Sequence, residues 1–190
     1  MNRRNAVPGE GDKNSPVVFI GEAPGEKEDE MGRPFVGAAG KLLTELIESM
    51  GYKREMFYIT NVVKCRPPGN RDPEDDEIDA CLPYLLRQLQ LIKPKLIVTL
   101  GRHAARTIFR LGGLRWVSMS SQHGRVYPAK ILSSSVRVIP TYHPASALYR
   151  PQLKGDLERD FREVIKPEID AIFGKQTPKS KPRTLYDFIK

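Results

Sequence analysis

Short runs of nearly continuous apolar residues alternate along the chain with longer segments in which apolar residues recur every three or four positions. The runs predict strands that are buried on both faces, because such strands have no polar side to present to water. They occupy residues 17–20, 57–63, 96–100 and 136–139. Strands that alternate with helices predict a three-layer α/β/α fold with a central, mostly parallel four-stranded sheet.

Two helical stripes are clear between these strands. The first consists of Leu42, Leu43, Leu46, Ile47 and Met50. The second helix has a recognisable start, because Asp72 can cap it, Pro73 suits the first helical position, and acidic residues follow. Its inner stripe consists of Ile78, Cys81, Leu82, Leu85, Leu89 and Ile92. In a sheet of this kind, ligands bind at the carboxyl ends of the strands.

Composition adds a basic tail and argues against a membrane protein. The chain has 190 residues, with 31 Lys and Arg against 23 Asp and Glu, and a net charge of +8. Five basic residues and one acidic residue fall in 174–190, so we expect a domain over 1–173 followed by an extended basic tail. No apolar stretch approaches the ~18 residues that a membrane helix needs. The basic N-terminus lacks an apolar signal segment, and we expect a cytoplasmic monomer.

Two candidate binding segments follow the first predicted strand. The turn Gly21-Glu22-Ala23-Pro24-Gly25 has glycines that let backbone N–H groups approach a ligand, although a purely structural turn would have the same sequence. Acidic residues follow this turn and would repel a phosphate, which favours a neutral ligand. In Arg33-Pro34-Phe35-Val36-Gly37, the aromatic ring can cover a planar ligand or fill the core.

Two polar residues mark the ends of later strands. Asn61 interrupts an apolar run, and its amide has the acceptor and the donors that match a pyrimidine edge, although it could instead bond to the backbone. His143 follows the last predicted strand and can donate to a developing negative charge. Parallel strands place both residues at the same sheet edge as Gly21. We expect His103 and His123 to be structural or exposed.

Together and in this order, these segments resemble the family 4 uracil-DNA glycosylases of thermophilic bacteria and archaea. The resemblance runs from Asn5 to about Phe161, which is most of the chain. The segments that carry it are Gly21-Glu22-Ala23-Pro24-Gly25, Arg33-Pro34-Phe35-Val36-Gly37, Thr60-Asn61-Val62-Val63-Lys64-Cys65-Arg66-Pro67-Pro68 and His143-Pro144-Ala145. It implies a uracil-DNA glycosylase-like fold and a base excision repair enzyme that flips uracil out of DNA. The enzyme would hydrolyse the base–deoxyribose bond and leave an abasic site.

Three other interpretations stay open beside this one. A broader glycosylase of the same superfamily would also accept other deaminated bases, such as hypoxanthine or xanthine. A catalytically silent DNA-binding module would share the fold without the chemistry. A nucleotide-binding α/β protein is disfavoured, because the first turn is followed by acidic residues and contains no lysine.

The resemblance also implies roles for the pocket residues. The ring of Phe35 would lie against the flipped uracil, and Asn61 would read the edge of the base. Backbone N–H groups near Glu22 and Ala23 would bind its oxygen. His143 would donate to the departing base. Glu22 is our candidate for orienting the attacking water, although a carboxylate that only supports the loop would look identical in the sequence.

Four further residues complete the predicted site. Glu28 matches the acidic residue that crowds the 5-methyl group of thymine in the family. Leu148 is a candidate wedge for the gap that the extruded base leaves, or else a core residue of the next helix. Arg150 and Lys154 would contact phosphates.

Family members bind a four-iron four-sulfur cluster through four cysteines, and Cys65 and Cys81 match one pair of these ligands. A C-x-x-C pair expected upstream of Asn5 is absent from this sequence. We favour a truncated or misassigned start over a protein that works without a complete cluster. Two buried structural cysteines would also fit, because Cys81 belongs to an apolar stripe.

The C-terminal residues contain a short candidate docking motif. Leu185, Phe188 and Ile189 resemble the peptide by which repair enzymes bind the sliding clamp, although Pro182 stands where a glutamine is usual. The alternative is a basic terminus that contacts DNA without specificity.

Overall fold

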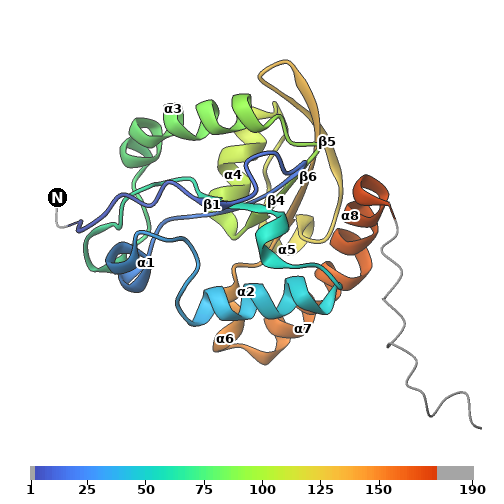
Figure 1. The fold of residues 1–190 in the computed structure, drawn as a ribbon, viewed down its shortest axis with the longest axis horizontal. Coiled ribbons are helices and arrows are strands. Elements are labelled where there is room, and N and C mark those ends of the chain that lie inside the picture. Colours follow the sequence, from blue (N-terminus) through green and yellow to red (C-terminus); the bar gives the residue numbers. More distant parts are fainter. Residues whose placement is uncertain (1–2, 175–190) are drawn as a thin grey trace, which may run out of the picture.

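A six-stranded sheet runs through the middle of the molecule in the order β1-β3-β2-β4-β6-β5 (Figure 1). Its strands are β1 (Glu10–Gly11), β2 (Val17–Gly21), β3 (Tyr58–Asn61), β4 (Leu96–Leu100), β5 (Tyr127–Ile131) and β6 (Ser134–Thr141). Strands β3, β2, β4 and β6 are parallel, while β1 and β5 pair antiparallel at the two edges. The computed structural model describes residues 3–174 and confirms the predicted α/β class, with a mixed sheet of six strands in place of four.

Strands β1 and β5 were not predicted, because neither contains a run of apolar residues. β1 has only two residues. β5 alternates between half-buried and exposed positions, and contains Pro128 and Lys130, residues that are tolerated at a sheet edge. Of the predicted strands, 96–100 has the observed bounds, 57–63 is shortened to β3, and 136–139 is extended to β6.

Helices cover both faces of the sheet (Figure 1). One face carries α2 (Ala38–Ser49), α6 (Pro144–Leu148), α7 (Pro151–Asp160), the π-helical segment η3 (Phe161–Ile165) and α8 (Lys166–Phe173). The other face carries α3 (Asp75–Ile92) and α4 (Arg102–Leu111). β2 separates the two cores, since Val17 and Phe19 pack on the α2 side and Val18 and Ile20 on the α3 side.

Four short elements lie in the connections. They are α1 (Glu26–Met31), η1 (Arg54–Met56), η2 (Pro68–Asn70) and α5 (Met119–Gln122). Within residues 3–174, no helix is both long and apolar enough to span a membrane. Apart from Gly174, the predicted tail lies outside the described residues, and so do the candidate clamp residues Leu185, Phe188 and Ile189.

The start of α3 corrects one prediction. Its N-cap is Glu74 and not Asp72, and the helix begins at Asp75. Glu74 and Glu77 form a capping box, in which each side chain accepts a hydrogen bond from the backbone N–H of the other residue. Asp72 instead forms an ion pair with Arg102 at the start of α4.

Candidate active site

A cavity of about 670 Å³ opens at the carboxyl ends of the parallel strands. Seven of the predicted site residues line it, namely Glu22, Ala23, Glu28, Phe35, Asn61, His143 and Arg150. They come from five separate stretches of the chain. The structure therefore brings most of the predicted site to one place, at the sheet edge where ligands of α/β proteins bind.

Gly21 lies at the centre of this arrangement. A Cβ atom added to Gly21 would lie 2.4 Å from Asn61 Oδ1 and 2.4 Å from Phe35 Cζ. The ring of Phe35 is in turn stacked near the imidazole of His143, with 5.7 Å between ring centroids and 29° between planes. The turn, the aromatic ring, the amide and the imidazole thus converge on one pocket, and the missing side chain of Gly21 makes room for it.

Asn61 supplies an unused acceptor to the pocket. The residue is 1% exposed, and its Oδ1 atom has no hydrogen-bond partner among the residues that the structure describes. A buried polar atom without a partner costs about 1–3 kcal/mol, so such atoms usually have a functional reason. The reason favoured here is a ligand that donates to Oδ1.

A buried lysine fixes the strand end that carries this amide. Lys64 Nζ donates to the backbone oxygen of Asn61 at 2.6 Å, to Thr60 Oγ1 at 2.7 Å and to Gln88 Oε1 at 2.8 Å. These three bonds use all the donors of an ammonium group. Burial lowers the pKa of Lys64 to about 7, although the nearby Cys81 raises it.

Phe35 has a strained backbone that its neighbours hold in place. Its φ of 53° lies in the left-handed region, which is unusual for a bulky residue. Glu28 Oε1 accepts hydrogen bonds from the backbone N–H groups of the next two residues, Val36 at 2.9 Å and Gly37 at 2.8 Å. The loop is therefore held from inside the cavity by the carboxylate of Glu28.

The same loop is held from the outside by β1. Arg54 Nη2 donates to the backbone oxygen of Pro34 at 2.7 Å and to Glu10 Oε1 at 2.8 Å. The other oxygen of Glu10 accepts from Arg33 Nε at 2.8 Å. The short strand that the apolar pattern missed thus contributes to the placement of the aromatic ring.

His143 is the N-cap of α6, and its Nδ1 atom accepts a hydrogen bond from the backbone N–H of Ala145 at 3.1 Å. In the neutral ring the proton is therefore on Nε2. Burial lowers the pKa of His143 to about 4, although the carboxylate of Glu28 raises it. At neutral pH the residue is an uncharged hydrogen-bond donor.

Glu22 faces a charged cluster that sequence reasoning missed. His103 Nε2 lies 4.0 Å from Glu22 Oε2 and 3.3 Å from Asp72 Oδ2. Burial raises the pKa of the Glu22 carboxyl, the charge of Asp72 raises it further, and His103 and Arg102 lower it. A signal for His103 was present, because it comes three residues after the end of β4, in the first turn of α4, and so lies at the same sheet edge as the other site residues.

The three side chains Glu22, Asp72 and His103 are the only group of at least three candidate metal ligands found in residues 3–174. Arg102 already places a positive charge there, since its Nη2 pairs with Asp72 and its Nε donates to His103 Nε2 at 3.1 Å. The guanidinium thus supplies the charge that a cation would bring.

His123 has the structural role that was expected. Its Nδ1 atom lies 2.8 Å from Asp160 Oδ2, which also accepts from Thr141 Oγ1 at 2.7 Å. This buried cluster ties the end of α7 to the end of β6. None of these three residues lines the cavity, but the ring of His123 packs on Tyr142, which does, with 4.6 Å between ring centroids.

Two predicted DNA contacts lie outside the cavity lining. Leu148 ends α6 and is 41% exposed, which disfavours a core role. Lys154 lines a second hollow of about 360 Å³ that α2 and α7 border, and its Nζ lies 3.8 Å from Glu158. Arg150 does line the active-site cavity.

Cys65 and Cys81 are the two candidate ligands for an iron–sulfur cluster in this sequence. Cys65 Sγ accepts a hydrogen bond from Arg3 Nη1 at 2.6 Å, and Cys81 Sγ accepts one from the backbone N–H of Lys64 at 3.5 Å. A four-iron four-sulfur cluster takes four thiolates, and this sequence contains two cysteines. Neither cysteine joins a group of three candidate ligands within residues 3–174. The residues present do not fit a complete cluster.

Comparison with known proteins agrees with this geometry. The sequence profile described as the Uracil DNA glycosylase superfamily matches residues 8–166. A Type-4 uracil-DNA glycosylase of Sulfurisphaera tokodaii is 56% identical over 163 residues, which cover 85% of this chain and 74% of that protein. The Type-4 enzyme of Saccharolobus solfataricus is 51% identical over 188 residues, covering 98% and 82%. That of Archaeoglobus fulgidus is 49% identical over 187 residues, covering 98% and 89%.

Proposed function

The chain belongs to the uracil-DNA glycosylase superfamily, and we propose that it is a repair enzyme that excises uracil from DNA. It flips the uracil nucleotide out of the stack and hydrolyses the N-glycosidic bond, leaving an abasic site. The observation that carries this proposal is the unpartnered Oδ1 of Asn61 beside the ring of Phe35. An acceptor next to a flat apolar surface suits the N3–H of uracil.

We assign the recognition of the base to three groups. The ring of Phe35 stacks on the extruded base, and Asn61 Oδ1 accepts from its N3–H while the amide nitrogen donates to O4. The carboxylate of Glu28 lies in the same wall and crowds the position of a 5-methyl group. The bond of Glu28 to the Phe35 loop supports this assignment, because it fixes the carboxylate close to the ring.

The next step is the cleavage of the bond between the base and the sugar, which leaves a negative charge on uracil. As the bond between N1 and C1′ breaks, its electron pair moves to uracil, and the negative charge spreads to O2. His143 Nε2–H donates to this oxygen and stabilises the anion. A neutral donor suits this role, because it need not lose solvation or a counter-ion when the charge develops.

Water completes the reaction at C1′. We assign the orientation of this water to Glu22, whose carboxylate accepts a water hydrogen while the water oxygen approaches C1′. The hydroxyl group of the water bonds to C1′, and the other proton of the water goes to the carboxylate. The proton then returns to solvent or to the uracil anion.

The remaining proposals concern DNA contacts, assembly, the C-terminal residues and the two cysteines. We propose that Leu148, Arg150 and Lys154 contact DNA, that this chain acts as a monomer, and that residues from 174 onward form a tail that binds the sliding clamp. We further propose that the two cysteines hold no complete cluster. An iron assay and the visible absorption spectrum of the purified chain test this last point.

The function is tested by incubation with single- and double-stranded oligonucleotides that contain one uracil, followed by alkaline cleavage and detection of free uracil. We expect strand scission at the uracil position only. Parallel substrates with hypoxanthine or xanthine identify a broader glycosylase. The absence of any base release from all of these substrates would leave a DNA-binding module as the better interpretation.

A further inference from the structure

Tyr149 is the most exposed of the large hydrophobic side chains in the described part of the chain, at 85%. It is the C-cap of α6, directly after Leu148 and directly before Arg150. Within residues 3–174 the ring is packed against little else, so the core gives no reason for a tyrosine at this position. Tyr149 is not part of the cavity lining, but the next residue, Arg150, is. An exposed ring beside a cavity-lining residue suggests a partner with a flat surface.

We propose that the ring of Tyr149 stacks on the base next to the extruded uracil, in the same DNA strand. This inference rests on the proposed function, since it requires a nucleotide to occupy the cavity. The partner is recognised by its chemistry, because every nucleobase offers a face on which an aromatic side chain can stack.

Distance along the chain supports this placement. His143 caps α6 at its N-terminus, and the five residues of this helix extend about 7.5 Å at 1.5 Å per residue. Tyr149 therefore lies one short helix away from the histidine that meets the base. The Cα atoms of Leu148 and Tyr149 are neighbours in the chain and so lie about 3.8 Å apart. This spacing is close to the rise of about 3.4 Å between successive bases in a strand. If Leu148 fills the gap that uracil leaves, Tyr149 is therefore in reach of the adjacent base.

The corner that carries the ring is fixed. Pro151 begins α7, and a proline restricts the preceding residue to an extended backbone, which Arg150 adopts with φ −136° and ψ 99°. α6 packs against both α2 and α7. A tyrosine on a fixed corner loses little conformational entropy on binding, because it has only two side-chain torsions.

The charge of Arg150 indicates which of the two DNA strands Tyr149 contacts. Arg150 lines the cavity, and its guanidinium forms no ion pair within residues 3–174. A free cation beside the pocket suits the phosphate of the nucleotide whose base has entered it. Residues 148–150 thus follow the uracil-bearing strand, and Tyr149 meets a base of that strand.

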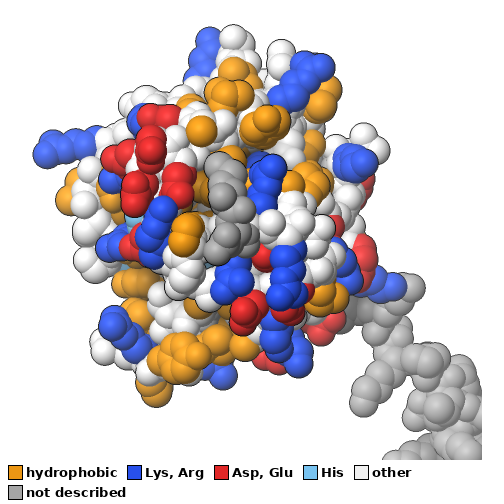
Figure 2. Space-filling model, turned by 90° about the vertical axis from the view of Figure 1, so that its left-hand side faces the viewer, with side chains coloured by type: hydrophobic (Ala, Val, Ile, Leu, Met, Phe, Trp, Pro, Cys, Tyr) orange, Lys and Arg blue, Asp and Glu red, His pale blue; other side chains and the backbone are white. Residues whose placement is uncertain are grey.

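In Figure 2, hydrophobic side chains gather at the lower edge of the face, the level at which Figure 1 draws α6.

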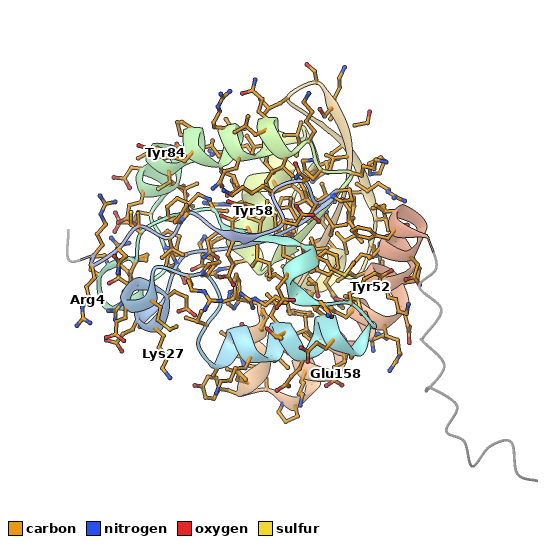
Figure 3. The ribbon with its side chains drawn as sticks, in the orientation of Figure 1. Arg4, Lys27, Tyr52, Tyr58, Tyr84 and Glu158 are labelled. Atoms are coloured by element: carbon orange, nitrogen blue, oxygen red, sulfur yellow. The ribbon has the colours of Figure 1, made fainter. Side chains whose placement is uncertain are left out.

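Tyr84 provides a matched control. It is a second exposed tyrosine, at 66%, and belongs to α3. Figure 3 shows it on the opposite side of the sheet from α2, the helix against which α6 packs. It does not line the active-site cavity. Removal of its ring therefore changes exposed aromatic surface without changing the proposed contact.

The test measures binding to DNA that contains a stable abasic analogue with 2-aminopurine on either side of it. Single strands and duplexes are both used, with the wild-type chain and the variants Tyr149→Ala, Tyr149→Phe and Tyr84→Ala. We expect the Tyr149→Ala variant to bind about tenfold more weakly to both forms and to lose the quenching of one 2-aminopurine. The Tyr149→Phe and Tyr84→Ala variants should resemble the wild type.

Equal affinity of the Tyr149→Ala variant and the wild type would overturn the inference. A loss confined to duplexes would also overturn it, because the ring would then contact the opposite strand. Uracil release by the wild-type chain is measured separately. If the wild type releases no uracil, the proposed function fails, whereas uracil release without any effect of Tyr149→Ala on binding counts against the inference alone.

Discussion

The backbone N–H of Ala145 donates to His143 Nδ1 at 3.1 Å, and this bond determines which ring nitrogen carries the proton. With Nδ1 occupied as an acceptor, the neutral imidazole has its proton on Nε2. The short helix α6 therefore does more than connect the last strand to α7. Its first turn selects the tautomer that can donate to a departing base.

Replacing His143 by Ala should slow single-turnover excision by about 10²–10³, the usual effect of losing one donor to a developing anion. Affinity for DNA with an abasic analogue should change much less, because the contact strengthens only as the bond breaks. Rapid-quench kinetics and anisotropy titrations measure the two quantities. An unchanged excision rate would exclude His143 from the reaction.

The pH profile separates His143 from Glu22. Burial lowers the pKa of His143 to about 4, so the ring stays neutral through the range in which an ordinary histidine titrates. The pKa of the Glu22 carboxyl is raised from its ordinary value of 4.5, mainly by burial. The excision rate should therefore fall on the acid side as Glu22 becomes protonated, and the titration of His143 should contribute no step near pH 6.5.

The Glu22→Gln variant provides the matching control. Its rate should be low, and the acid limb should be missing, since the group that titrates is gone. Histidine resonances followed by NMR report the titration of His143 directly. A step near pH 6.5 in both the rate and the His143 resonance would contradict the assignment of a neutral donor.

Substitution can separate the hydrogen bonds by which Glu28 holds the Phe35 loop from its proposed exclusion of a 5-methyl group. Glu28→Ala removes the acceptor of the Val36 and Gly37 N–H groups, each bond contributing about 1 kcal/mol, and opens space for a 5-methyl group. We expect a higher KM for uracil substrates and the first detectable release of thymine from T·G pairs. Glu28→Gln keeps a carbonyl acceptor and the bulk, so it should bind uracil substrates nearly normally and exclude thymine. Thymine exclusion by the Ala variant would leave Glu28 only its role in holding the loop.

The helices and strands whose formation depends on residues close together in the sequence could be predicted from the sequence. The stripe in α2 is apolar at helical spacing, and the buried parallel strands are apolar throughout, so both could be found. The N-cap of α3 was assigned two residues too early. Asp72 and Glu74 are both able to cap, and only the reciprocal bond with Glu77 decides between them.

The convergence of most candidate site residues on one cavity was predictable, because parallel strands bring their carboxyl ends together and because the motifs resembled a known family. The long-range contacts that hold the site residues in position were not predictable in this way. The bond between Arg54 and Pro34 joins residues 20 positions apart, and Glu10 lies 44 positions from Arg54. His103 approaches Glu22 across two neighbouring strands. These contacts are set by tertiary distances that no local pattern encodes.

Gly21 gives the sharpest test of the pocket itself. A Cβ atom there would lie 2.4 Å from both Asn61 Oδ1 and Phe35 Cζ, so the Gly21→Ala variant must displace the amide, the ring or the base. A misplacement of about 1 Å can reduce a rate about 10²-fold, and we expect a loss of at least this size in kcat/KM on uracil DNA. Gly155→Ala in α7 is the control, since nothing lies within 4 Å of its added Cβ and alanine favours a helix by about 0.5–1 kcal/mol. It should melt at a higher temperature and excise uracil normally. If Gly21→Ala folds and retains full activity, the base does not bind between Asn61 and Phe35.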